Sequence, residues 1–170
     1  MKQYLCLSVV GLLTVAFAPN IMAEEPKTIG WIEHVQIQPN GLTLKAKIDT
    51  GADNSSVHAE PITVYEKEGA KWVKFSVANK AGEKADFDLP MTRYALIKRK
   101  GAEPLRRPVV TMTLCLGNTL KKVNINLANR ENFKYRMLIG RSYLQDTLLV
   151  NSGKKHTVEP SCTGDNFAQR

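Results

Sequence analysis

Apolar and polar residues alternate with a period of two along most of this chain, and this pattern constrains the fold more than any other feature. Alternation puts every second side chain on one face of an extended strand, so that one face packs inward while the other faces solvent. We find no helical stripe of useful length. The alternating segments lie at 35–37, 42–48, 62–64, 73–77, 87–89, 110–116 and 123–127. The sequence therefore predicts an all-β protein.

The turn signals between these segments favour the same fold class. Asn40-Gly41 separates the first two segments and supplies the positive φ angles that a tight hairpin needs. Segment 93–107 is basic and contains glycine and proline, so we expect it to be a mobile excursion. Only residues 141–145, which follow a glycine, have the pattern of a short helix.

The N-terminus has the pattern of a secretory signal peptide. Lys2 precedes an apolar run over 5–18, which is shorter than the roughly 20 apolar residues of a membrane span. Cleavage after Ala23 is favoured over cleavage after Ala18, because the second would place a proline first in the product. We predict a signal peptide over 1–23, a periplasmic or secreted mature protein, and no membrane span after cleavage. An uncleaved membrane anchor is the alternative.

The length of 170 residues suits one domain, which we place over 24–158 with a loose C-terminal tail over 159–170. Export would leave two cysteines, Cys115 and Cys162, in a compartment where disulfides persist. We predict that they pair and tie the tail to the body. Two free thiols are the alternative.

The chain is basic, with 24 Lys and Arg against 16 Asp and Glu. A basic surface suits an anionic envelope polymer, although it also aids solubility. The cations are scattered in small groups and lack the interleaved aromatic residues of a protein that binds single strands. We therefore expect no nucleic-acid partner.

Two motifs far apart in the chain suggest chemistry. Asp49 ends an alternating segment and begins the turn Asp-Thr-Gly-Ala, a weak signal by itself, because an Asp that ends a strand is ordinarily an exposed turn residue. Residues 137–141 add two bulky aliphatic residues, a glycine and a polar helix start. Together the motifs resemble the active site of a retroviral-type aspartic protease (a retropepsin), in which a downstream hydrophobic-hydrophobic-Gly segment braces the catalytic turn.

This resemblance implies a single-domain retropepsin-like closed β-barrel with one short C-terminal helix. An aspartic protease needs two carboxylates that share one proton, so that one acts as a base while the other donates a hydrogen bond. One chain of this length offers one such residue. The resemblance therefore implies a homodimer with Asp49 of each subunit at the twofold axis.

The resemblance also implies which residues support the catalytic loop: Thr50, Gly51, Ala52, Asp53, Leu138, Ile139, Gly140 and Arg141. Thr50 is expected to form a hydrogen bond across the dimer interface. Retropepsins have an ion pair at the positions of Asp53 and Arg141. We expect this pair to be buried beneath the site, so that breaking it costs about 3–5 kcal/mol. We place the flap that covers the substrate within 72–89.

A closer match than the viral enzymes is a bacterial retropepsin-like family that is often labelled an ATP-dependent zinc protease. Segments 47–59, 107–110 and 129–130, followed by 137–141, resemble this family over nearly the whole mature chain. The label has no support in these residues, because the sequence lacks a phosphate-loop motif and a His-Glu-x-x-His motif, and its three histidines are scattered. We therefore predict neither a cofactor nor a metal.

Two further residues are candidates for contact with the substrate. His58 follows the catalytic turn by nine residues, and we favour a histidine whose ring is satisfied by the backbone over one that contacts substrate. Arg130 is a candidate for bracing the catalytic loops or for contact with an acidic substrate, and we favour bracing. Ser55 and Ser56 have no evident base nearby in the sequence.

We predict an exported aspartic endopeptidase that cleaves peptides or proteins of the cell envelope. One alternative is a catalytically silent module of the same fold that binds peptides or envelope polymers, because extended ligands add readily to a sheet edge. Another is a hydrolase of an unusual amide, such as a γ-glutamyl bond or a peptidoglycan cross-link. An Asp49→Asn variant separates the first two, because it would abolish cleavage and leave binding largely intact.

Overall fold

The computed structural model describes residues 25–99 and 101–162, so the expected signal peptide over 1–23 lies outside the described part. The elements in chain order are β1 (Lys27–Gly30), β2 (Ile32–Gln38), β3 (Leu42–Ile48), β4 (Ser55–His58), β5 (Ile62–Lys67), β6 (Ala70–Ala78), β7 (Lys84–Arg99), β8 (Ala102–Leu116), β9 (Thr119–Ala128), β10 (Met137–Ile139), α1 (Arg141–Leu144) and β11 (Leu148–Asn151). The predictions of an all-β class and a short C-terminal helix are confirmed. No helix in these residues is long and apolar enough to cross a membrane.

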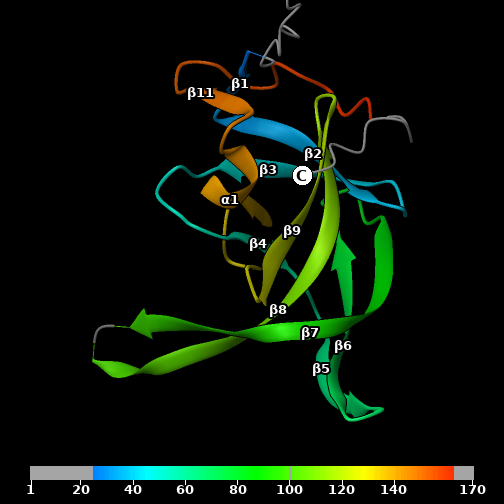
Figure 1. Ribbon diagram of the computed structural model, residues 1–170. Coiled ribbons are helices and arrows are strands. Elements are labelled where there is room, and N and C mark those ends of the chain that lie inside the picture. The colour runs from blue at the N-terminus through cyan, green and yellow to red at the C-terminus, as the bar shows by residue number, and fades with distance from the viewer. Residues whose placement is uncertain (1–24, 100, 163–170) are drawn as a thin grey trace, which may run out of the picture.

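Most strands belong to one sheet, with the order β2-β3-β10-β4-β9-β8-β7-β6-β5. An additional pairing between β2 and β8 closes β2, β3, β10, β4, β9 and β8 into a ring. β1 and β11 form a separate parallel pair (Figure 1). Closure of the ring pairs both edges of its strands and lets their inward side chains form one apolar core.

The β2–β3 hairpin shows how the alternating sequence builds this ring. Gly41 has a φ of 74° in the turn, as the Asn-Gly signal predicted. Val35 pairs with Leu44 across the two strands, and both are buried in the core together with Ala46. Lys45 lies between two buried positions and is exposed. The hydrophobic pattern thus sets the register of the strands that lead to the candidate site.

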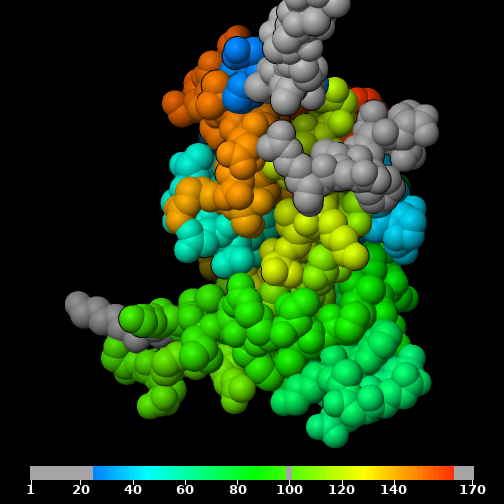
Figure 2. Space-filling model, in the orientation of Figure 1, coloured from blue at the N-terminus to red at the C-terminus, as the bar shows by residue number. Residues whose placement is uncertain are grey.

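Segment 93–107 is not the mobile excursion that we expected. It is the outer part of a long antiparallel hairpin, because β7 and β8 stay paired from Met91 and Val110 to Arg99 and Ala102. The hairpin forms an arm that projects from the body of the molecule (Figures 1 and 2). Its basic residues obscured the alternation, since backbone pairing does not require apolar side chains on either face.

The residues after β11 return to the body and form a C-terminal strap, which we define as residues 154–162. The backbone N–H of His156 donates to the Ile32 carbonyl over 2.8 Å, and that of Ser161 donates to the Gly117 carbonyl over 2.7 Å. Cys115 and Cys162, 47 residues apart, form a disulfide. The start of the expected tail over 159–170 is therefore fastened to β8 and to the turn that follows it.

Glu33 on β2 anchors the strap from inside the protein. Its side chain is fully buried, and its carboxylate accepts hydrogen bonds from the Gly30 N–H over 2.6 Å and from the Thr157 hydroxyl over 2.6 Å. The backbone N–H of Thr157 adds a further bond over 3.0 Å. No ion pair is formed by Glu33 within residues 25–99 and 101–162, and its buried carboxylate is tolerated because several donors converge on it.

We expect Glu33→Gln to lower the free energy of unfolding by about 2 kcal/mol, because an amide NH2 would replace one acceptor oxygen among N–H donors. Urea denaturation measures this change. Glu66→Gln, at an exposed position on β5, is the matched control and should unfold at the same urea concentration as the parent. Equal stability of the Glu33→Gln variant would contradict the anchoring role.

Candidate active site

Asp49 lies directly after β3, at the point where this strand runs beside β10. The parallel register pairs Ile48 with Ile139, and the backbone N–H of Asp49 donates to the Ile139 carbonyl over 2.8 Å. The carboxylate accepts a hydrogen bond from the Gly51 N–H over 3.1 Å. This bond holds the carboxylate against its own turn. The side chain is 27% exposed, so the carboxylate is still accessible from solvent.

The second motif holds the catalytic loop, which we define as residues 49–54. The first N–H groups of α1 have no partners within the helix, and those of Arg141 and Ser142 donate to the carbonyls of Ala52 over 2.8 Å and Asp53 over 3.0 Å. Gly140 packs so closely against the loop that an added Cβ would lie 2.6 Å from the carbonyl carbon of Asn54. Only glycine fits this contact.

The strand of the second motif fills the space between β3 and β4. Ile139 is fully buried in the core, and Leu138 is half-buried and pairs with Ser56. The hydroxyl of Ser55 accepts a hydrogen bond from the Gly140 N–H over 3.1 Å. Ser55 and Ser56 are thus buried parts of the scaffold.

Asp53 and Arg141 form an ion pair, as the resemblance implied, but the pair is not buried. Their side chains are 75% and 50% exposed, respectively. The Arg141 guanidinium also donates to the Thr50 carbonyl over 2.9 Å. The expected cost of 3–5 kcal/mol was wrong for this chain alone, because an exposed pair contributes roughly 0–1 kcal/mol. Thr50, Gly51 and Asp53 are exposed on the same loop.

His58 is a buried residue at the end of β4. Its ring Nδ1 accepts a hydrogen bond from the backbone N–H of Arg130 over 2.9 Å. Burial lowers the pKa of His58, and the charge of Arg136 lowers it further. The neutral ring with its proton on Nε2 fits these contacts. His58 therefore fixes the start of the loop after β9, as favoured from the sequence.

Arg130 and Arg107 bring two guanidinium groups to this region. Arg130 is buried, and its Nε donates to the Tyr135 carbonyl over 3.3 Å. Burial lowers the pKa of Arg130, the charge of Arg107 lowers it further, and the charge of Asp49 opposes both. The charge of Arg107 thus disfavours the charged form of Arg130, and the charge of Asp49 favours it. Arginine stays charged in proteins, so this repulsion persists.

Arg107 has an unused donor. Its Nη1 donates weakly to the Asn126 side chain over 3.4 Å, while its Nε is buried and has no hydrogen-bond partner among the described residues. Burial lowers the pKa of Arg107. Lys47 adds a third cation, with its Nζ 3.5 Å from the Asp49 carboxylate. A buried donor without a partner is a polar group that a bound ion or ligand can complete.

Sequence reasoning assigned no role to Lys47 or Arg107. A signal for Arg107 was present, because it stands two residues before the buried Val109 on an alternating strand. A charged residue in that position faces either solvent or a polar site. Its proximity to Arg130 depends on the pairing of β8 with β9 and could not be found from spacing along the chain.

The hairpin that contacts the catalytic loop is β7–β8, where the Arg93 guanidinium donates to the Asn54 side chain over 3.3 Å. The flap expected within 72–89 was wrong. The turn of that β6–β7 hairpin lies at the other end of β3, where the Asn79 side chain donates to the Thr43 carbonyl over 3.2 Å. Asp49 follows the opposite end of the same strand. The arm over 93–107 therefore begins beside the catalytic loop.

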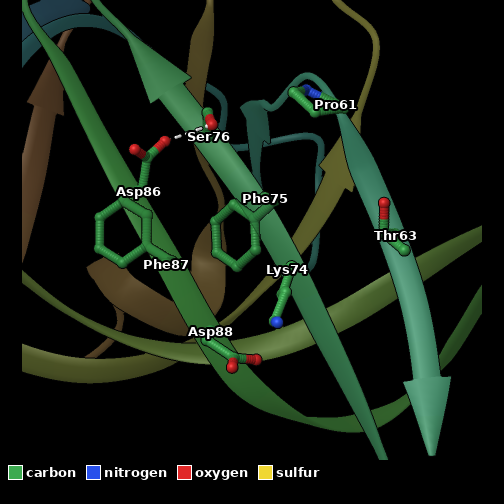
Figure 3. Close-up of a pocket in the computed structure, with 8 residues that line it drawn as sticks. All are labelled: Pro61, Thr63, Lys74, Phe75, Ser76, Asp86, Phe87 and Asp88. Atoms are coloured by element: carbon green, nitrogen blue, oxygen red, sulfur yellow. Dashed lines mark hydrogen bonds between the residues drawn. The ribbon is translucent and has the colours of Figure 1, made fainter.

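A separate pocket of about 350 Å³ lies on β5, β6 and β7 (Figure 3). Its rim includes a hydrogen bond from Ser76 to Asp86, and none of its lining residues belongs to the catalytic loop. Among residues 25–99 and 101–162, no three His, Cys, Asp or Glu side chains gather as metal ligands would. The absence of a cofactor stays a prediction.

The fold and the loop together define a class of protein. An all-β ring that presents Asp-Thr-Gly after one strand, held by a Gly-Arg segment after another, has the arrangement of a retropepsin-like aspartic endopeptidase. The model of the RimB-like family, described as retropepsin-like aspartic endopeptidase RimB, matches residues 28–161. The chain belongs to this family.

Relatives named as ligases also match. A probable alpha-L-glutamate ligase of Shewanella pealeana is 30% identical over 72% of this chain and 26% of its own length. One of Shewanella halifaxensis is 32% identical over 64% of this chain and 24% of its own length. The chain thus spans about a quarter of these curated relatives.

A solved structure has the same fold. The crystal structure of Lpg0085 from Legionella pneumophila, a protein of unknown function, is similar with a TM-score of 0.69 and 32% identity. The similarity covers 79% of this chain and all of the solved one.

The environment of His58 predicts how stability depends on pH. In the unfolded chain His58 takes up a proton near its ordinary pKa of 6.5, whereas in the folded protein it does so only at lower pH. The unfolded state therefore binds more protons in this window, and the free energy of unfolding falls as the pH drops below about 6.5. Urea denaturation at about pH 7.5 and about pH 5.5 measures this loss.

The matched variant is His58→Asn, whose side-chain oxygen can accept the bond from Arg130 without titrating. We expect it to lose less stability than the parent between the two pH values. His156→Asn, at an exposed position, is the control and should keep the dependence of the parent. The same dependence in the His58→Asn variant would contradict this account.

Proposed function

We propose that this protein is an exported aspartic endopeptidase that acts as a homodimer, with Asp49 of each subunit forming the catalytic pair. The observation that supports this most is the placement of Asp49. Its backbone N–H is bonded to the Ile139 carbonyl, while its carboxylate stays partly exposed. Asp-Thr-Gly occurs once in the sequence, so a second carboxylate of this kind comes from a second copy.

The chemistry follows from two carboxylates that share one proton. The ionised carboxylate removes a proton from a water molecule, whose oxygen attacks the carbonyl carbon of the scissile amide. The protonated carboxylate donates a hydrogen bond to the carbonyl oxygen and stabilises the tetrahedral intermediate. Proton transfer to the amide nitrogen then lets the C–N bond break, which gives a carboxylate and an amine. Rigid bracing of the loop keeps both carboxylates in position.

Several exposed groups support a partner on the face of the catalytic loop. Thr50, Asp53 and Arg141 are exposed there, although they form a connected set of hydrogen bonds and an ion pair. Burial of this face in a dimer would remove solvent from the Asp53–Arg141 pair and strengthen it.

Export is supported by the disulfide between Cys115 and Cys162, because disulfides persist in oxidising compartments. A disulfide that closes a loop of this length stabilises the folded chain mainly by restricting the unfolded one. The same bond fastens the C-terminal strap, so a reducing compartment would weaken the strap.

We infer that the substrate is acidic at the cleavage site. The Lys47 Nζ lies 3.5 Å from the Asp49 carboxylate, and the charges of Asp49 and Arg107 both act on the buried Arg130. Arg107 has a buried Nε without a hydrogen-bond partner among the described residues. A glutamate or aspartate side chain would satisfy this donor and relieve the repulsion between the two arginines. The names of the matched relatives, probable alpha-L-glutamate ligases, agree with a glutamate-containing substrate. A comparison of cleavage between glutamate peptides with main-chain amide bonds and glutamate peptides with γ-glutamyl bonds shows which amide is cleaved.

The Asp49→Asn variant should lose cleavage of acidic peptides by more than a thousandfold, because an amide cannot act as the base. Activity of the parent should rise more than linearly with protein concentration where dimers are forming. Chromatographic separation of peptide products measures both. Equal cleavage by parent and variant would contradict the catalytic role. Inactivity of both, with acidic peptides still bound, would favour the silent binding module.

The Arg107→Leu variant should lower kcat/KM for acidic peptides by roughly 10- to 100-fold, because a charge-assisted hydrogen bond is lost. Its thermal stability should equal or exceed that of the parent, since the change removes an unpaired buried donor. Cleavage of neutral peptides should change little. Arg107→Lys is the matched control that keeps the charge. A parallel loss of activity on acidic and neutral peptides would contradict the substrate preference.

A further inference from the structure

A second basic pocket lies away from the catalytic loop, beside the first half of β3. Its volume is about 310 Å³, which is within the size range of small-ligand sites. Its walls come from β3, from the turn between β6 and β7, and from the loop before β10. The lining residues are Leu44, Lys45, Asn79, Lys80, Lys134, Tyr135 and Arg136.

The lining is strongly cationic. It includes three lysines and one arginine and no carboxylate. Within the part of the chain that the structure describes, no carboxylate lies within ion-pair distance of Lys45, Lys80 or Lys134. Glu83 accepts a hydrogen bond from the side chain of Asn79 over 2.6 Å, but it does not line the pocket. Cations that converge without counter-charges favour an anionic ligand.

The walls of the pocket are tied to each other, so its shape is formed before any ligand binds. The Asn79 side chain donates to the Thr43 carbonyl over 3.2 Å and accepts from the Ala81 N–H over 3.0 Å, which fixes the turn against β3. The Arg136 guanidinium donates to the Ala78 carbonyl over 3.3 Å and joins the loop to the same turn. A preformed site loses little entropy when it binds a ligand.

One loop connects this pocket with the active site. Arg130 stands at the active-site end, and Lys134 and Arg136 stand at the pocket end. Tyr135 takes part in both, because its carbonyl accepts the bond from the Arg130 Nε while the residue lines the pocket. The loop therefore carries three cations between the two regions, Arg130, Lys134 and Arg136, and one carboxylate, Glu131. An extended acidic polypeptide could place its carboxylates beside these cations.

We propose that this pocket is an exosite that binds carboxylates of an acidic substrate segment, away from the amide that Asp49 cleaves. The inference rests on the acidic substrate proposed above. It predicts that the protein prefers long acidic chains over short ones, because only a long chain reaches both the active site and the pocket.

The test measures binding to the full chain with the Asp49→Asn change, which prevents turnover. The probes are a fluorescent oligoglutamate of about twelve residues, which extends over roughly 40 Å, and one of about four residues. The pocket variant is Lys80→Gln with Lys134→Gln. The matched control is Lys67→Gln with Lys71→Gln, which removes the same charge from exposed positions elsewhere.

We expect the pocket variant to bind the long probe roughly tenfold more weakly, with a smaller difference at high salt, and to bind the short probe as the parent does. The control variant should bind both probes as the parent does. Equal weakening in pocket and control variants, or no weakening in either, would overturn the exosite. A competition experiment with inorganic triphosphate adds a further test. If triphosphate binds in the pocket and does not displace the long probe, the exosite is overturned and the pocket is a phosphate site.

The two proposals fail in different ways. If the parent binds the short acidic probe through Arg107 and the pocket variant binds the long probe as tightly as the parent does, the exosite alone is wrong. If neither acidic probe binds while a neutral peptide is cleaved by the Asp49 protein, the acidic substrate is wrong and the exosite with it.

Discussion

The structure depends on the contact between the segment after β10 and the catalytic loop. The N–H groups of Arg141 and Ser142 hold the carbonyls of Ala52 and Asp53, and Gly140 allows the two backbones to touch. This contact joins residues that are about half the chain apart. The ring of strands exists in this form because β10 must lie between β3 and β4 to make it. The position of Asp49 is therefore a property of the whole sheet.

The second feature of the site is the set of charged groups near Asp49. Lys47 lies beside the partly exposed Asp49 carboxylate, the charges of Asp49 and Arg107 both act on the buried Arg130, and one buried guanidinium donor of Arg107 has no partner in the described part of the chain. Such an arrangement costs folding free energy unless a ligand supplies the missing negative charge. Functional sites commonly retain such unfavourable groups because binding resolves them. An acidic substrate would complete both the charge balance and the hydrogen bonds.

Local patterns predicted what depends on short stretches of chain. Alternation and the Asn40-Gly41 signal predicted the β2–β3 hairpin, and two motifs predicted the loop at Asp49 and its brace. The role of Arg107 was missed because its neighbours come from other strands. The arm over 93–107 was misjudged because exposed basic residues conceal strand alternation. The exposure of the Asp53–Arg141 pair depends on what covers the loop, which no local pattern contains.

The claim that two copies of Asp49 form one catalytic pair is tested most directly by mixing subunits. A fixed amount of active protein is allowed to exchange subunits with increasing amounts of the Asp49→Asn variant, and cleavage of an acidic peptide is followed. If the pair spans two subunits, activity per active chain falls as the variant is added, because mixed dimers have one carboxylate. If activity per active chain stays constant, each chain works alone and the account of a shared pair is wrong.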